Sequence, residues 1–265
     1  MSFVARLAVH ALLLIAALCC NRAFAHDTWL LPVHADSSAT TTFELTSGMD
    51  FPTADYSIPA ERIATRGCRA KDSDCTLQVG TNGEHALALS AKLADGVPAV
   101  VWVDLAAKAL ELDADQVEEY LTEIDPPASV RAAYMAQPEP RHWRETYVKH
   151  TKALIGSTDS TPTVWSKPIG SGLEIIPSQD SHLSKNSDAR FRVVSAGKPL
   201  ADFAVGVIDG SAAKPRLLRT DASGEINLRI DRSGYWLLRA TELKPSTTKD
   251  MDWDSRFATL AFDVR

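Results

Sequence analysis

The chain has 265 residues and a formal net charge of −6 at pH 7, with 34 acidic residues against 28 Lys and Arg. An acidic chain is a poor candidate for binding nucleic acid or an anionic lipid surface. This length is enough for one large or two small domains with their own cores, so the totals favour a globular protein with no nucleic-acid partner.

Residues 1–25 have the three parts of a secretory signal peptide. Arg6 gives the basic start, an apolar run covers residues 7–20, and Ala23-Phe24-Ala25 is an A-x-A cleavage site. The apolar run is shorter than the ~20 residues that a membrane span needs. We therefore expect cleavage after Ala25, export to the periplasm, and a mature chain that does not span the membrane.

Short apolar runs separated by turn residues follow the leader as far as residue 105. They predict antiparallel strands at 29–31, 40–45, 62–65, 75–79, 85–89 and 97–103. Because no helical pattern separates these runs, they favour a sandwich over a parallel sheet. We assign residues 26–160 to an N-terminal β-sandwich.

The four cysteines fall into two groups. Cys19 and Cys20 lie in the leader, where acylation of either is the alternative to cleavage after Ala25, although Leu18 is bulkier than a lipoprotein signal normally tolerates. Cys68 and Cys75 have six residues between them and predict a disulfide at a hairpin tip in an oxidising compartment. A metal–thiolate site is the competing interpretation, but the spacing is not C-x-x-C.

The pattern becomes helical from about 112 to 155. Asp113 is a candidate N-cap with Gln116 three residues later, and Pro126-Pro127 separates this helix from a second one. A third helix is predicted from Glu139 to Leu154, on a stripe that includes Trp143 and Tyr147. These three helices would form an insertion in the first sandwich.

Strands resume after the polar connector 156–162. They are predicted at 173–177, 189–194, 203–208, 225–230, 235–240 and 257–264, with Gly-, Pro- and Asp-rich turns between them. We assign residues 161–265 to a C-terminal immunoglobulin-like sandwich. The predicted fold class is therefore mainly β, with two immunoglobulin-like or transthyretin-like sandwiches and a three-helix insertion in the first.

A series of short motifs runs in order along the mature chain. They are His26-Asp27-Thr28-Trp29-Leu30-Leu31-Pro32, Thr151-Lys152-Ala153-Leu154, Leu173-Glu174-Ile175-Ile176-Pro177, Gly197-Lys198-Pro199-Leu200, Thr220-Asp221-Ala222-Ser223-Gly224, Gly234-Tyr235-Trp236 and Asp252-Trp253-Asp254-Ser255. Together they resemble the exported family of unknown function numbered 4198, once labelled a nickel-transport subunit. The C-terminal half also resembles carboxypeptidase-regulatory-like and transthyretin-like modules, which are usually structural or binding units.

The resemblance implies a periplasmic, β-rich protein associated with uptake of nickel, cobalt or another transition metal. An envelope transport protein is the partner expected on this basis. The opening His-Asp-x-Trp-Leu motif of the family corresponds to His26, Asp27, Trp29 and Leu30. No reaction is implied.

His26 is the sharpest chemical signal in the sequence. Cleavage after Ala25 would give one residue both a free α-amine and an imidazole, and neutral nitrogen donors suit copper and nickel. Asp27 is a candidate ligand or could orient the imidazole, as carboxylates often do beside metal-bound histidines. The competing interpretation is a frayed terminus retained because Trp29 and Leu30 enter the core.

The second ligand is left open by the sequence. His34 is the nearest candidate along the chain, and further single histidines are found at His85, His142, His150 and His182. A lone histidine is more often a surface residue than a ligand. Asp250, Asp252 and Asp254 suggest calcium, but they lack the loop glycine and closing glutamate of an EF-hand, so a solvated turn with Trp253 buried is preferred.

No Gly-x-Ser-x-Gly, P-loop or dinucleotide motif occurs in the sequence. We therefore predict a protein that is not an enzyme and that binds nickel, cobalt or copper through His26. The alternative is a structural or interaction module of the cell envelope. A copper oxidase built on the N-terminal histidine is least favoured, because it needs a second histidine beside His26.

Overall fold

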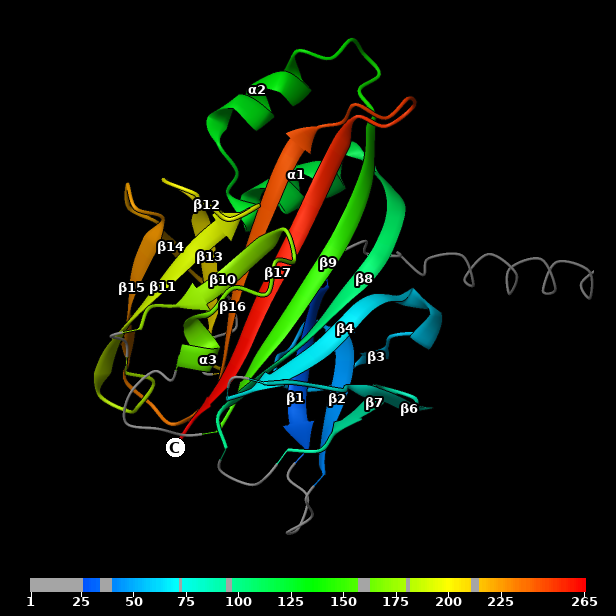
Figure 1. The fold of residues 1–265 in the computed structure, drawn as a ribbon. Coiled ribbons are helices and arrows are strands. Elements are labelled where there is room, and N and C mark those ends of the chain that lie inside the picture. The colour runs from blue at the N-terminus through cyan, green and yellow to red at the C-terminus, as the bar shows by residue number, and fades with distance from the viewer. Residues whose placement is uncertain are drawn as a thin grey trace, which may run out of the picture.

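The computed structural model describes residues 26–33, 40–71, 73–93, 97–156, 163–179, 182–210 and 215–265 (Figure 1). The predicted leader and His34 lie outside these residues. The described chain is mainly β, as predicted. Each predicted strand range overlaps an observed strand.

An eight-stranded sheet runs through the middle of the molecule (Figure 1). Its strands, in spatial order, are β14 (Arg216–Arg219), β13 (Ala204–Ile208), β16 (Gly234–Pro245), β17 (Trp253–Val264), β9 (Trp143–Ile155), β8 (Ala99–Leu112), β4 (Ile63–Ala70) and β5 (Ser73–Cys75). Neighbouring strands are antiparallel except β17 and β9, which are parallel.

Two smaller sheets pack against this central sheet. The five-stranded sheet contains β1 (Asp27–Val33), β2 (Thr41–Gly48), β7 (Leu87–Ala91), β6 (Gln78–Asn82) and the short β3 (Tyr56–Ser57). The four-stranded sheet contains β10 (Leu173–Pro177), β11 (Ser187–Ser195), β12 (Lys198–Pro199) and β15 (Glu225–Ile230).

The alternation of side chains on the central strands places a core on each face. Val100 and Leu154 join the core under the four-stranded sheet, whereas Val101 and Ala153, each one residue away, join the core under the five-stranded sheet. Successive side chains of a strand point to opposite faces, so one strand supplies both cores. The result is a β-rich sandwich with the long sheet in the middle.

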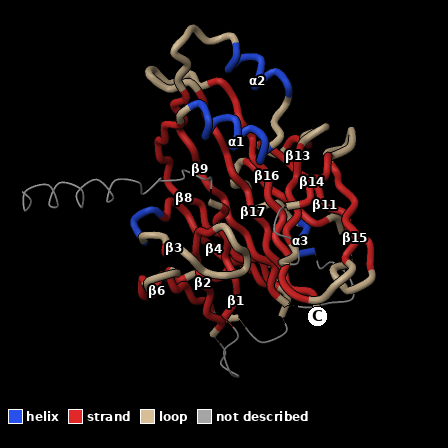
Figure 2. The backbone as a smooth tube through the Cα atoms, turned by 180° about the vertical axis from the view of Figure 1, so that it is seen from behind, coloured by secondary structure: helices blue, strands red, loops and turns tan. Residues whose placement is uncertain are grey.

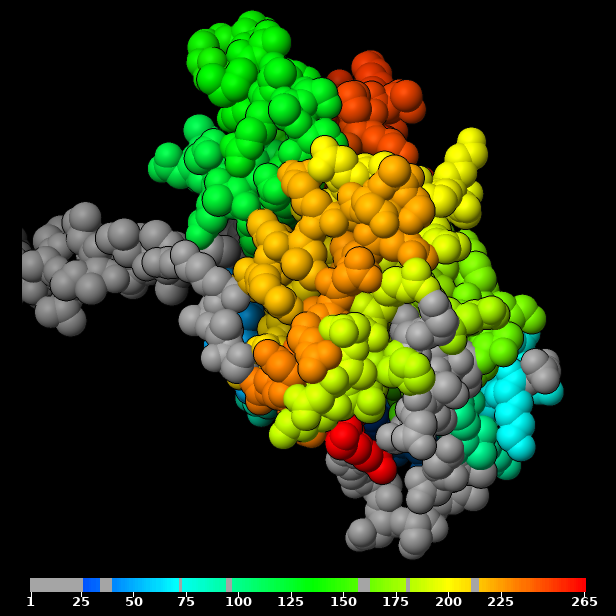
Figure 3. Space-filling view, turned by 90° about the vertical axis from the view of Figure 1, so that its left-hand side faces the viewer, coloured from blue at the N-terminus to red at the C-terminus, as the bar shows by residue number. Residues whose placement is uncertain are grey.

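Two helices cover one end of the central sheet, α1 (Ala114–Ile124) and α2 (Ala128–Met135), and they form the lobe at the top of Figures 2 and 3. α1 begins with the predicted capping box, in which Asp113 and Gln116 each accept a hydrogen bond from the other's backbone N–H at 2.9 Å. The remaining helical turns are η1 (Ala60–Arg62) and α3 (Thr163–Ser166).

The predicted third helix, from Glu139 to Leu154, is wrong, because most of this segment is strand β9. Its aromatic and β-branched residues suit a strand as well as a helix stripe. β9 pairs with β8 on one side and β17 on the other, and these long-range partners decide the conformation. The helical insertion therefore contains only α1 and α2.

The predicted boundary between residues 160 and 161 falls in a stretch outside the described residues. Strands from both sides of it belong to the central sheet, joined where β9 pairs with β17. The division into two domains stays a prediction.

Candidate functional site

The backbone at His26 leads directly into the folded sheet. The β1–β2 ladder starts at the next residue, with Asp27 opposite Gly48. The hydroxyl of Thr259 on β17 donates to the carbonyl of Thr28 at 2.5 Å, which fixes β1 against the central sheet. A strand paired on one edge and held on the other leaves its first residue little freedom.

Lys149 on β9 holds the backbone of His26 directly. Its amine donates to the His26 carbonyl at 2.5 Å and to Thr28 Oγ1 at 3.2 Å. The rings of Tyr147 and Phe257 lie 5.8 and 5.7 Å from the same amine. Burial lowers the pKa of Lys149 to about 8, although the negative charge of Asp27 opposes this shift.

The imidazole of His26 is half-buried against an aromatic ring. It meets Tyr56 edge to face, with ring centroids 5.1 Å apart. Burial lowers the pKa of His26 below its ordinary value of 6.5, and the charge of Lys149 lowers it further. The ring is therefore mainly neutral at pH 7, which is the state that a metal ligand requires.

Asp27 points to the central sheet and pairs with an arginine. Its Oδ2 lies 3.0 Å from an Arg239 nitrogen, and the same nitrogen lies 2.5 Å from Glu123 Oε1 on α1. Burial raises the pKa of Glu123, although Arg239 opposes this effect. Strand β1, helix α1 and strand β16 thus meet at one guanidinium.

Two small pockets lie beside this ion cluster, and both are lined by Asp27, Arg239 and Phe257. The first is also lined by residues of α1, β13 and β14, namely Glu123, Ile124, Gly206 and Leu217. The second is also lined by His26 and by Lys149 of β9. The two pockets combine carboxylates, cations and apolar side chains near His26.

The described residues contain no group of three or more His, Cys, Asp or Glu side chains placed to hold a metal ion. Asp27 lies next to His26 in the chain, but its carboxylate is paired with Arg239. His85 lies in the turn between β6 and β7, where its Nδ1 is 3.1 Å from the Asp55 carbonyl. Within the described part of the chain, the nitrogen donors of His26 have no ready-made cluster of such ligands around them.

A second polar cluster lies on the face of the central sheet under β10. His150 Nδ1 is 2.8 Å from Asp104 Oδ1, and the other oxygen of Asp104 accepts from Thr65 and Ser171 at 2.6 and 3.2 Å. Nearby, Lys152 and Glu174 form a buried ion pair at 3.3 Å. The sequence singled out His150 only as a lone histidine, because a predicted helix hid its position on a strand.

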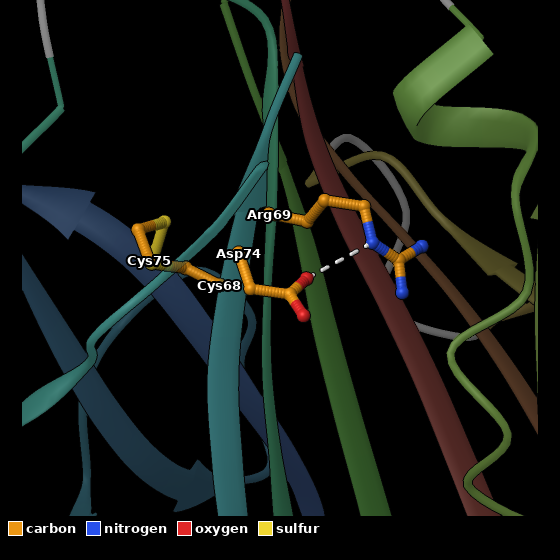
Figure 4. The surroundings of a disulfide bond; sticks show 4 residues. All are labelled: Cys68, Arg69, Asp74 and Cys75. Atoms are coloured by element: carbon orange, nitrogen blue, oxygen red, sulfur yellow. Dashed lines mark hydrogen bonds and ion pairs between the residues drawn. A yellow bond between two sulfur atoms is a disulfide. The ribbon is translucent and has the colours of Figure 1, made fainter. Parts of the chain in front are cut away.

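The predicted disulfide is present. Cys68 and Cys75 face each other on β4 and β5, with Cα atoms 5.0 Å apart, and Arg69 and Asp74 form an ion pair beside them (Figure 4).

The turn that contains Asp250 and Asp252 precedes β17. Asp252 pairs with Arg144 at 3.0 Å, and Trp253 is buried, as the sequence predicted.

Lys149, Arg239 and Glu123 were missed by the sequence reasoning. Arg239 is a single charged residue in an apolar run, whereas Glu123 and Lys149 have polar neighbours in the sequence. The available signal was a charge on an otherwise buried strand or helix face, but Lys149 lay inside the wrongly predicted helix. Their meeting depends on strands more than a hundred residues apart in the chain.

The fold defines a β-rich sandwich in which β1, a strand of the five-stranded sheet, is also bonded to β17 of the central sheet. None of the helices in the described residues is long and apolar enough to cross a membrane. The sequence matches the family described as Domain of unknown function (DUF4198) over residues 23–242, and the chain belongs to that family. No curated protein matches the chain.

Proposed function

We propose that the processed chain is a periplasmic accessory protein that binds a transition-metal ion, nickel, cobalt or copper, through the α-amine and imidazole of His26. The observation that carries the proposal is the hydrogen bond from Lys149 to the His26 carbonyl, which fixes the first residue of the processed chain. A residue whose backbone is already fixed loses less conformational entropy when it binds a metal than a frayed terminus does, so binding is more favourable.

The chemistry of His26 supports this use. Cleavage after Ala25 would expose an α-amine on the residue whose imidazole has a lowered pKa. The imidazole is then available as a neutral donor, and the α-amine gives up its proton when the metal binds. Asp27 then has a positioning role, because its pairing with Arg239 keeps the strand next to His26 in place. The leader blocks the chelate until it is removed.

We further propose that the chain is a binding protein and not an enzyme, and that it passes its metal to an envelope transport protein. The family label of a nickel-transport subunit and the transthyretin-like character of the C-terminal half are part of this proposal. In it, the C-terminal sheets serve as a scaffold that holds β1 and Lys149 together.

Calorimetry tests the proposal on two forms of the chain. One starts at His26, as mass spectrometry would verify, and the other carries one extra alanine before His26. We expect nickel(II) and copper(II) to bind the first form at least about tenfold more tightly, because the extra residue removes the amine from the chelate.

Two variants control the experiment. His26→Ala should lose binding as the extended form does, whereas His142→Ala, which changes an exposed histidine, should keep the wild-type affinity. Equal affinities for the two forms of the N-terminus would overturn the proposal. The interaction-module alternative would then be favoured.

A further inference from the structure

Two exposed side chains belong to the part of the five-stranded sheet where β1 begins. Met49 and Tyr56 are 50% and 55% exposed, and both are among the few large apolar side chains that the described residues leave in solvent. Tyr56 already contacts the His26 ring. Met49 directly follows Gly48, the partner of Asp27.

The register of β1 and β2 relates Met49 to His26. The antiparallel ladder ends with Asp27 opposite Gly48, and His26 and Met49 are the next residues of the two chain segments, one step beyond that last pair. Directly opposed residues of an antiparallel pair share a face of the sheet. Ser47, two residues before Met49, already bonds Thr28, two residues after His26, across that face at 2.5 Å.

The charges around His26 favour a cation of low charge. The Lys149 ammonium lies against the His26 carbonyl, and the nearby Asp27 carboxylate is paired with Arg239. Coulomb repulsion scales with the charge of the bound ion, so Lys149 opposes a divalent ion twice as strongly as a monovalent one at the same position. The carboxylates of Asp55 and Asp27 also act on the His26 ring, each more weakly than Lys149.

We propose that the metal bound at His26 is copper(I), and that the Met49 thioether supplies its sulfur donor. A thioether is a soft ligand that selects copper(I) over divalent nickel or cobalt, and imidazole also suits copper. The Tyr56 ring beside the imidazole adds an aromatic face that favours a bound cation. This inference rests on the proposed use of His26 as a ligand and names the ion for that site.

Anaerobic competition with the copper(I) chelator bicinchoninate tests the proposal on the processed chain. Met49→Leu keeps the apolar volume and removes the sulfur, so copper(I) affinity should fall by about tenfold or more. Nickel(II) affinity, measured by calorimetry, should change less than about twofold. Met135→Leu is the matched control, because Met135 is a similarly exposed methionine on α2, and it should leave both affinities unchanged.

The outcomes separate this inference from the proposed function. If Met49→Leu binds copper(I) as the wild type does, or if the processed chain binds nickel(II) more tightly than copper(I), the inference is overturned, while the effect of the extra N-terminal alanine still decides the use of His26. A sulfur ligand in the copper X-ray absorption spectrum, lost in Met49→Leu, supports the inference even if the variant loses some stability. Absence of sulfur in the wild-type spectrum overturns it.

Discussion

Arg239 is the residue at which the N-terminal strand, α1 and the central sheet are tied together. Its side chain is only 14% exposed and is shared by Asp27 and Glu123. Gly206 on the neighbouring strand gives it room, since a Cβ at that position would lie 2.8 Å from Arg239 Cγ and Nε. One guanidinium therefore compensates two carboxylates in a partly desolvated site.

Replacing this guanidinium should destabilise the fold. Arg239→Met leaves Asp27 and Glu123 close together without a cation, and breaking a largely buried ion pair from one side costs about 2–4 kcal/mol in the free energy of unfolding. Urea denaturation at neutral pH measures this loss. Arg229→Met, which removes an exposed pair with Asp188, should cost less than about 1 kcal/mol. Equal losses in the two variants would show that the Arg239 cluster carries no special stabilisation.

Glu145 is a buried carboxyl group whose ionisation destabilises the folded chain. It is fully buried and accepts hydrogen bonds from Trp143 and Tyr120 at 2.8 and 3.2 Å, and a third from Ser255. Burial raises its pKa above the ordinary 4.5, although these donors oppose the shift. Ionisation of Glu145 is therefore less favourable in the folded chain than in the unfolded chain.

The pH dependence of unfolding should reveal this group. The folded chain holds the Glu145 proton more tightly, so its stability falls as pH rises from the unfolded pKa through the raised folded pKa. Relative to Glu145→Gln, the wild type should be most stable below about pH 4.5, and its relative free energy of unfolding should decrease as the pH rises towards neutrality. Urea denaturation across this range measures the difference. Exposed Glu61→Gln should follow the wild-type profile, and a parallel profile for Glu145→Gln would contradict the prediction.

Among the secondary-structure elements, α1 could be predicted from neighbouring residues in the sequence, but β9 could not. The capping residues of α1 lie three positions apart and act on each other directly, so the sequence contains the whole signal. In β9, Trp143 and Tyr147 are spaced for a helix face, yet Lys149, Thr151 and Ala153 continue the same alternation on a strand. Only pairing with β8 and β17 separates the two interpretations, and those partners are distant in the sequence.

The capping box offers a prediction at this scale. Asp113→Ala removes the acceptor for the Gln116 N–H and should cost about 1 kcal/mol of stability. Asp115→Ala, in the first turn of the same helix, should cost only a few tenths of a kcal/mol, because it removes a favourable charge but no cap. Chemical denaturation of both variants gives the comparison. A larger loss for Asp115→Ala would mean that the helix dipole outweighs the cap.

The same contrast applies to the candidate site, where one residue could be predicted from its neighbours in the sequence and the others could not. His26 was found because its chemistry follows from a cleavage motif within a few residues. Lys149, Arg239 and Glu123 reach it from β9, β16 and α1, and the register of a large sheet cannot be read from the local pattern of each strand. Met49, which we propose as a sulfur ligand, was not considered from the sequence because the proposal depends on the β1–β2 register.

For the whole molecule, the central sheet makes the two halves of the chain depend on each other. β9, from residues before 160, pairs in parallel with β17, from residues after 161, through nine pairs from Glu145–Trp253 to Ala153–Ala261. The core under the four-stranded sheet also takes Val100 and Leu154 from the first half. Separation at this point would expose two long strand edges and part of a core.

We therefore expect that residues 26–160 and residues 161–265, expressed separately, do not fold as stable domains. Each fragment would present an unpaired central strand, β9 or β17, whose open N–H and C=O groups favour aggregation. Circular dichroism and thermal unfolding measure the outcome, with the processed full chain as the control. The two fragments mixed during refolding should recover a cooperative transition, because pairing of β9 with β17 restores the sheet. Cooperative unfolding of either fragment alone would instead establish two independent domains, and would show that the shared sheet contributes less to stability than the cores on its two faces.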